Sequence, residues 1–232
     1  MSKLQSFHTD VDMTMNLMLD VGGQEIATDV KVTGGVDTET NPLLIKADLI
    51  INILGVDQEL SFYIRMEGNV LKAYPYNGGK LSEPIVLNNN SNSGNQLSVT
   101  DLIKLALRLS SYFEDKGTEY IDGTAAKRYD GQIPDEDIDE IMNYLNLHSG
   151  GSLHKSSGTL PVSFWIDNND RIVRLQTDMA VVAQNLADGW LEALLNEYHL
   201  TGLNVDLNLR SMDSILTLSE FDSIDDISFP VQ

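Results

Sequence analysis

The sequence contains no cysteine, which excludes disulfide bonds, thiolate metal sites and cysteine nucleophiles. Basic residues are scarce, because 15 Lys and Arg stand against 35 Asp and Glu and leave a formal net charge of −20. Such an acidic surface repels phosphate backbones, so we expect no binding to nucleic acid. The four histidines, His8, His148, His154 and His199, lack the spacing of a metal site. We therefore expect neither a metal ion nor another cofactor.

Long apolar runs are also missing. No run approaches the roughly 20 residues that a membrane-spanning helix needs, and the start of the chain, MSKLQSFHTD, lacks the apolar core of a signal peptide. Two explanations stay open: a cytosolic protein, or a protein whose export segment has been removed. The sequence has no G-x-S-x-G nucleophile elbow, and its carboxylates are too numerous for any one pair to stand out as catalytic. We expect no enzymatic activity.

Residues 7–21, FHTDVDMTMNLMLDV, alternate between apolar and polar side chains. The odd positions carry Phe7, Val11, Met13, Met15, Leu17, Leu19 and Val21, with Thr9 as the polar exception. Because side chains on a strand alternate between its faces, this pattern predicts one strand with an apolar face and a polar face. At ~3.3 Å per residue it spans roughly 50 Å, two to three times a typical strand. A strand of that length indicates a large, strongly curved antiparallel sheet.

Turn signals separate a series of further strands. Gly22-Gly23, Gly68-Asn69 and the run 77–80 (NGGK) favour tight hairpin turns, and 168–170 predicts another turn within the hairpin 160–179. We expect Gly34-Gly35 and the polar run to Pro42 to end the second strand. The chain is predicted to close with two short strands, 203–210 and 215–221.

Three segments carry apolar residues at three- and four-residue steps and predict helices. The first begins near Ser98 or Thr100 and ends at Gly117, and the others cover 135–147 and 181–198. Since no linker divides the chain, residues 1–232 are expected to form a single domain. The predicted fold class is α+β: a strongly curved antiparallel sheet with about three helices covering its concave face, which the resemblance described below identifies as a half-barrel.

The predicted sheet and helices either fill each other completely or leave an apolar hollow. The side chains that we expect to line such a pocket are Met13, Met15, Leu17, Phe62, Ile64, Leu102, Leu109 and Phe164. The unbranched methionines among them suit a pocket of variable shape. Ordinary core packing explains the same residues, so both interpretations stay open.

Several short motifs, in this order of elements, resemble a known group. They are E-Y-x-x-G and Y-x-G within 119–131, L-P-V-S-F-W-I-D at 160–167, and I-S-F-P at 227–230. Together they resemble the LolA/LolB/LppX-like group of bacterial exported lipoproteins, including its Gram-positive branch. In that group a curved antiparallel half-barrel is closed by helices and holds acyl chains in its apolar hollow.

The resemblance implies a non-enzymatic binding protein of the cell envelope that holds a lipid or another hydrophobic ligand in its hollow. It also implies an extracytoplasmic precursor, anchored to the membrane only through a lipid-modified Cys that this sequence does not contain. The alternative is a structural or protein-interaction module with a fully packed core. In that case the acidic surface, or the loops 88–96 and 148–159, would meet a protein partner.

Overall fold

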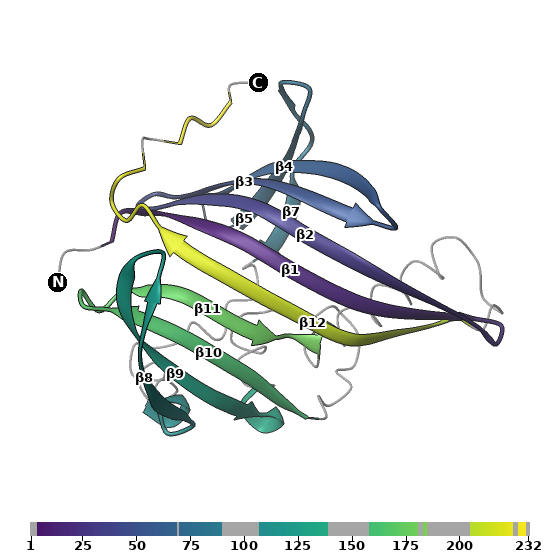
Figure 1. Ribbon diagram of the computed structural model, residues 1–232. Coiled ribbons are helices and arrows are strands. Elements are labelled where there is room, and N and C mark those ends of the chain that lie inside the picture. Colours follow the sequence, from purple (N-terminus) through teal and green to yellow (C-terminus); the bar gives the residue numbers. More distant parts are fainter. Residues whose placement is uncertain are drawn as a thin grey trace.

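The structure is a computed structural model that describes residues 4–68, 70–89, 107–138, 158–180, 183–184, 205–224 and 227–230. Within this part of the chain, 12 antiparallel strands form one open sheet in the order β6-β5-β4-β3-β2-β1-β12-β11-β10-β9-β8, and β7 pairs with β5 (Figure 1). The first and the last strand of the sequence, β1 and β12, therefore lie side by side at the centre of the sheet.

The first half of the sheet is a meander of seven strands. Its members are β1 (Ser6–Val21), β2 (Gln24–Thr40), β3 (Leu43–Ile53), β4 (Val56–Glu67), β5 (Val70–Asn77), β6 (Lys80–Leu81) and β7 (Ile85–Asn89). β1 pairs with β2 along its whole length, from Ser6 opposite Glu39 to Val21 opposite Gln24. The long first strand and the glycine turn that follows it are as predicted.

The second half is a meander that returns to the centre. Its strands are β8 (Phe113–Ile121), β9 (Thr124–Pro134), β10 (Thr159–Asp167), β11 (Ile172–Asp178) and β12 (Val205–Ser219). The last of these is one strand of 15 residues, where the sequence predicted two short ones. It stays paired with β1 because a bulge accommodates Arg210, between Ser211 opposite Asn16 and Leu209 opposite Leu17.

The second strand does not end at its glycine pair, contrary to the prediction. β2 continues through Gly34 and Gly35 to Thr40. A Cβ atom at Gly34 would lie 2.2 Å from the carbonyl oxygen of Asp48, and one at Gly35 would lie 2.7 Å from the Cε1 atom of His8. The two glycines thus admit close neighbours inside the sheet, as glycine often does in a strand interior.

The prediction of about three helices over the concave face is wrong for the described part of the chain, where helical segments are short. The first predicted helix is helical at 107–110, but β8 has already begun at Phe113. The hydroxyls of Ser110 and Ser111 bond back to the carbonyls of Leu107 and Arg108 at the end of this turn. Its predicted last residue, Gly117, lies instead at a strand bulge with φ 97.

The other two predicted helices lie mainly outside the described residues. Of the segment 135–147, the structure describes 135–138, which is helical. The predicted helix 181–198 is described only at 183–184, which is also helical. The described layer is therefore almost entirely sheet.

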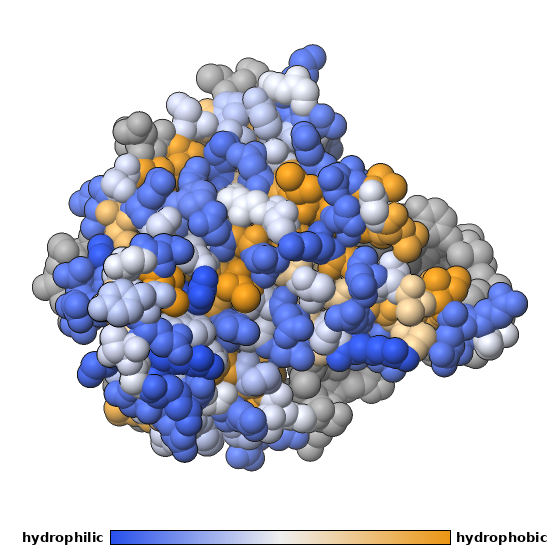
Figure 2. Space-filling view, viewed as in Figure 1, coloured by the Kyte–Doolittle hydropathy of each residue, from blue (hydrophilic) through white to orange (hydrophobic). Residues whose placement is uncertain are grey.

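The sheet has an apolar face and a polar face, which the register defines. The apolar face carries the odd-numbered residues of β1 and the residues paired with them on each successive strand. Figure 2, viewed from the same side as Figure 1, is dominated by hydrophilic residues, as expected for the polar face. In this view β5 and β7 bend behind β2 and β3, so the apolar face lies on the concave side (Figure 1).

Candidate functional site: the apolar face of the sheet

The apolar face is continuous across the sheet. One row of paired residues runs across eight strands as Leu60, Leu49, Gly34, Val11, Leu216, Leu175, Phe164 and Tyr129. No charged residue interrupts this row. Cross-strand neighbours on one face have Cβ atoms about 5 Å apart, so these side chains form one apolar surface, broken only at Gly34, which has no side chain.

Three of the predicted pocket residues, Met13, Met15 and Leu17, lie on this face along β1. Met15 is opposite Met212 on one side and Val30 on the other. All three predicted residues are only partly buried. They therefore share one strand face at the centre of the concave side, as the alternation predicted.

The predicted residues on other strands also belong to the apolar face, but at a different height. Phe62 on β4 pairs with Ala47 of β3, and this row continues through β2 to Thr9 of β1. Ile64 on β4 pairs with Ile45 of β3, and its row continues through β2 to Phe7 of β1. Phe164 on β10 aligns instead with the row of Val11. The predicted set is thus spread over the apolar face and does not form one compact cluster.

The far margin of the apolar face is closed by an aromatic group around Phe164. Its ring lies 4.9 Å from that of Phe113 and is stacked 5.2 Å from that of Tyr129. Leu109, a predicted pocket residue, packs with Phe113 against the buried pair Ile133 and Ile138. Leu102 lies outside the described residues.

Sequence reasoning missed Phe113 and Tyr129 as members of this group. Phe113 had been assigned to a helix, and Tyr129 had been used only as part of a motif. Gly131 was a usable signal in the sequence, because a glycine inside a strand often marks the close approach of another group. In the structure, a Cβ atom at this position would lie 2.5 Å from the Phe113 ring.

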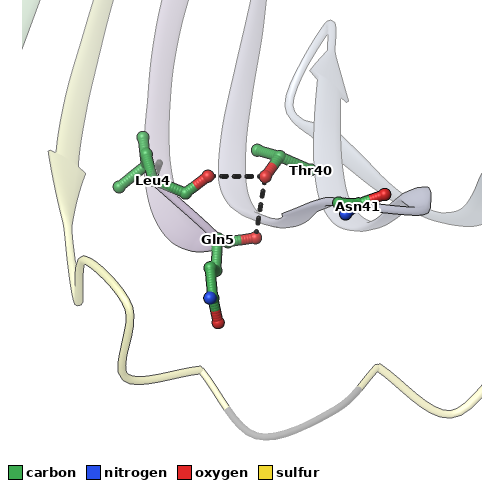
Figure 3. Close-up of a pocket in the computed structure, with 4 residues that line it drawn as sticks. All are labelled: Leu4, Gln5, Thr40 and Asn41. Atoms are coloured by element: carbon green, nitrogen blue, oxygen red, sulfur yellow. Dashed lines mark hydrogen bonds between the residues drawn. The ribbon is translucent and has the colours of Figure 1, made fainter. Parts of the chain in front are cut away.

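A separate hollow of about 690 Å³ lies at the end of the sheet where β1 begins, and its described lining is Leu4, Gln5, Thr40 and Asn41. The hydroxyl of Thr40 donates to the carbonyl oxygens of Leu4 at 2.6 Å and Gln5 at 3.2 Å (Figure 3). The contacts between these lining residues are polar, whereas the pocket predicted from the sequence is apolar. None of the predicted pocket residues belongs to the described lining of this hollow.

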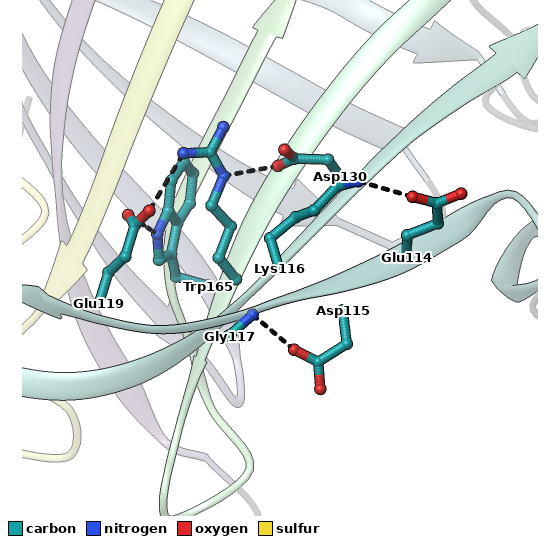
Figure 4. Close-up of polar contacts among 8 residues, drawn as sticks. Glu114, Asp115, Lys116, Gly117, Glu119, Asp130 and Trp165 are labelled. Carbon is teal, nitrogen blue, oxygen red and sulfur yellow. Dashed lines mark hydrogen bonds and ion pairs between the residues drawn. The ribbon is translucent and has the colours of Figure 1, made fainter.

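The polar face carries a tightly paired group around Trp165 (Figure 4). The indole N–H donates to Glu119 at 2.8 Å, and the Arg128 guanidinium bonds to Glu119 at 3.2 Å and to Asp130 at 2.7 Å. The bond from Trp165 and the pairing with Arg128 lower the pKa of Glu119 below its ordinary value. These groups satisfy one another, so they act as a structural network on the outer side of the sheet.

A second network on the polar face surrounds Glu67 at the end of β4. Its carboxylate accepts hydrogen bonds from Lys72, Tyr74 and Arg65. The bond from Lys72, followed by those from Tyr74 and Arg65, lowers the pKa of Glu67 to about 2. This carboxylate therefore stays ionised and paired at ordinary pH, which suits a structural role.

No group of three or more His, Asp or Glu side chains in the described part of the chain is placed to hold a metal ion. No described helix is long and apolar enough to cross a membrane.

No protein-family model matches the chain, and no curated protein sequence matches it. Among solved structures, the chain is similar to the lipoprotein LppX of Mycobacterium tuberculosis, with 20% identity over 97% of this chain and 91% of that one and a TM-score of 0.49. It is also similar to LprF of Mycobacterium bovis, with 17% identity over 99% of this chain and 91% of that one and a TM-score of 0.43. LppX is one of the proteins after which the group resembled by the sequence motifs is named. Likenesses at this level do not identify a ligand, which has to follow from the chain's own geometry.

Proposed function

We propose that this is a non-enzymatic binding protein that holds a lipid or another hydrophobic ligand against the concave, apolar face of its sheet. The observation that carries the proposal is the continuity of that face. It extends across the sheet from β4 to β9, and Met13, Met15, Leu17, Phe62, Ile64 and Phe164 all lie on it only partly buried. Leu109 and Leu102 complete the set of proposed lining residues.

The chemistry of the face favours an uncharged ligand. Its positions on β1, β2 and β12 carry no Lys, Arg, Asp or Glu between Phe7 and Leu19 and along their paired residues. Covering apolar surface releases about 25 cal/mol for each Å², so an acyl chain laid along several partly exposed side chains gains binding energy without any ionic contact. Met13, Met15 and Met212 are unbranched and adapt to chains of different shape.

The proposal includes the location that the sequence resemblance implies, the extracytoplasmic side of the cell envelope. There a protein with an apolar hollow and an acidic exterior is suited to move a water-insoluble molecule. The alternative from the sequence, a packed interaction module, is retained as the opposite outcome of the same experiment.

The experiment combines ligand identification with a matched pair of variants. Purified protein is examined by native mass spectrometry and organic extraction, and binding of the neutral probe N-phenyl-1-naphthylamine is followed by fluorescence. Met15→Gln places an amide on the apolar face, whereas Met18→Gln makes the same change on the polar face of the same strand. We expect Met15→Gln to weaken probe binding about tenfold, the effect of roughly 1.4 kcal/mol, and Met18→Gln to leave it unchanged.

Two results would overturn the proposal. One is a protein that neither carries an extractable lipid nor binds the probe, which would favour the packed module. The other is an equal effect of both variants, which would place the probe away from the apolar face.

A further inference from the structure

Two hydroxyl groups on the apolar face have no hydrogen-bond partner. In the described part of the chain, three buried side-chain oxygen atoms lack such a partner, and they are Thr28 Oγ1, Ser214 Oγ and Asp137 Oδ2. The carboxylate of Asp137 is nevertheless ion-paired through its other oxygen. The two hydroxyls lie on the apolar face, because Ser214 pairs with Met13 and Thr28 pairs with Leu17. Unpaired polar atoms therefore lie where the proposed ligand would bind.

Ser214 is the more deeply buried of these two residues. It is 2% exposed, whereas Thr28 is only partly buried. A change of rotamer can bring the hydroxyl of Thr28 to solvent, but the same change at Ser214 leaves its hydroxyl inside the protein. Folded proteins satisfy nearly all buried polar groups, because an unpaired one costs free energy. The exception at Ser214 therefore requires an explanation.

The position of Ser214 is central on the apolar face. It lies on β12, between Met13 of β1 and Thr177 of β11 (Figure 1). The hydroxyl of Thr177 donates to the carbonyl of Pro161 at 2.8 Å and makes no bond with Ser214. Alanine or valine at this position would continue the apolar face without an unpaired hydroxyl. Because the fold gains nothing from the hydroxyl, we look for its role in binding.

The apolar neighbours of Ser214 on this face include two methionines. Met13 is opposite Ser214 on β1, and Met212 precedes it by two residues on β12. Both methionines are partly buried and unbranched, so they can change rotamer without a movement of the backbone. A ligand laid along β1 and β12 can therefore reach the hydroxyl by displacing flexible side chains. This accounts for a hydroxyl that is buried by its neighbours and is still unpaired.

The chemistry of a serine hydroxyl narrows the class of ligand. It offers one hydrogen to donate and two lone pairs to accept. A ligand carbonyl accepts the hydrogen and brings no donor of its own, so no polar hydrogen is left unpaired. An alcohol that accepts the same hydrogen would still need an acceptor for its own. A carboxylate would be buried without a cation beside it, because the paired positions on β1, β2 and β12 of this face carry no Lys or Arg.

We propose that the hydroxyl of Ser214 donates a hydrogen bond to a carbonyl oxygen within the bound ligand, which is therefore a neutral lipid that carries a carbonyl group and not a hydrocarbon. This inference rests on the proposed function and deepens it, because it makes Ser214 the residue that distinguishes one apolar ligand from another. The apolar residues around it hold the hydrocarbon parts of the ligand. The hydroxyl fixes the position of the carbonyl group along β12, where no water competes for the bond.

The experiment compares two compounds of equal length. Methyl hexadecanoate and octadecane have the same number of chain atoms, and only the first carries a carbonyl group. Each compound displaces N-phenyl-1-naphthylamine from the protein, and the loss of fluorescence gives its affinity once the affinity of the probe itself is known. We expect Ser214→Ala to weaken binding of methyl hexadecanoate about tenfold and to leave binding of octadecane unchanged.

The matched control is Ser219→Ala, which makes the same change on the same strand. Ser219 pairs with His8 on the polar face, so this variant should bind both compounds as the parent does. The thermal unfolding midpoint, measured without added compound, is an independent readout. Because alanine removes a buried hydroxyl that has no partner in the fold, we expect the midpoint of Ser214→Ala to lie at or above that of the parent.

The outcomes separate this inference from the proposed function. If Ser214→Ala weakens binding of both compounds equally, or of neither, the hydroxyl does not recognise a carbonyl group, and the apolar face remains the binding surface. A midpoint of Ser214→Ala several degrees below that of the parent also overturns the inference, because it would show that the hydroxyl is bonded within the fold. A parent protein that binds neither compound nor the probe removes the proposed function, and this inference with it.

Discussion

At the scale of single residues, His8 shows how the polar face is specified. Its Nδ1 lies 2.6 Å from Asp37 Oδ1, and its Nε2 lies 3.4 Å from Asp10 Oδ1. The ring occupies the space beside Gly35 that a Cβ atom would need. The polar face of β1 and β2 therefore holds an imidazole ring between two carboxylates, which favour its protonated form.

This arrangement makes stability depend on pH. Burial disfavours the charged ring, but the hydrogen bond and charge of Asp37, with Asp10, outweigh it and raise the pKa of His8 above its ordinary value. A raised pKa contributes stability that is complete below the unfolded value of about 6.5 and is lost as pH rises through the folded value. We expect His8→Asn to be destabilising at pH 5.5 by up to about 1 kcal/mol and much less so at pH 8.5.

Denaturant unfolding at the two pH values checks this prediction. Asp37→Asn should reproduce the effect, because it removes the main partner of the imidazolium. A loss of stability in His8→Asn that is the same at both pH values would show that the ring contributes by packing alone.

At the scale of elements, the residues after β12 form a strap across the polar face, made of 220–224 and 227–230. Near its start the N–H of Asp222 donates to the carbonyl of Ser6 at 2.9 Å. Phe221 lies beneath Arg171 and packs on a buried apolar cluster that consists of Ile121, Ala126, Trp165 and Val173. Near its end Phe229 lies against Tyr63 and Tyr74 of β4 and β5. The strap thus has one aromatic contact on each half of the sheet.

The contact at Phe229 is expected to hold β4 and β5 in place. Its ring covers Tyr63 and Tyr74, and the guanidinium of Arg65 lies 3.8 Å above it. We expect Phe229→Ala to lower the free energy of unfolding by about 2–3 kcal/mol, somewhat less than for a fully buried phenylalanine. Amide hydrogen exchange in β4 and β5 should accelerate more than in β9 and β10.

Ser228→Ala is the matched control for the strap, because this neighbouring side chain is exposed. It should leave both stability and exchange unchanged. Uniform acceleration across the whole sheet in Phe229→Ala would show that the strap has no local role.

At the scale of the whole molecule, two meanders meet along one central pair of strands. β1 and β12 pair from His8 opposite Ser219 to Val21 opposite Val205. This pairing joins the two meanders through segments that lie 184 residues (Val21 and Val205) to 211 residues (His8 and Ser219) apart in the sequence. It also places the greatest length of paired backbone at the centre of the concave face.

The charge of the whole molecule predicts its response to salt. A net charge of −20 favours expansion of the chain, and the repulsion is long-range at low ionic strength. We expect the thermal unfolding midpoint to rise by several degrees when NaCl increases from about 0.02 M to 0.2 M, as the screening length falls from roughly 20 Å to 7 Å. Sucrose at equal osmolality separates screening from general solute effects. A midpoint that falls with salt would show that the ion pairs of the polar face outweigh the net repulsion.

Local patterns in the sequence determined the strands and their turns. Alternation over 7–21 is a property of neighbouring residues, and so are the glycine turns at Gly22-Gly23 and Gly78-Gly79, because both depend on backbone conformation alone. The sequence also determined that Met13, Met15 and Leu17 share a face, and that Phe62 shares one with Ile64.

Only the tertiary structure decided where these faces lie relative to one another. The pairing of β1 with β12 joins distant segments and leaves no local signature, so sequence reasoning had no means to place both at the centre of the sheet. Gly34-Gly35 read as a turn, although Asp48 and His8 are what require glycine there. Phe113 read as helical because its spacing fitted a helix, whereas pairing with Gly131 of β9 makes it a strand residue. In each case a contact between segments far apart in the sequence outweighed the local preference.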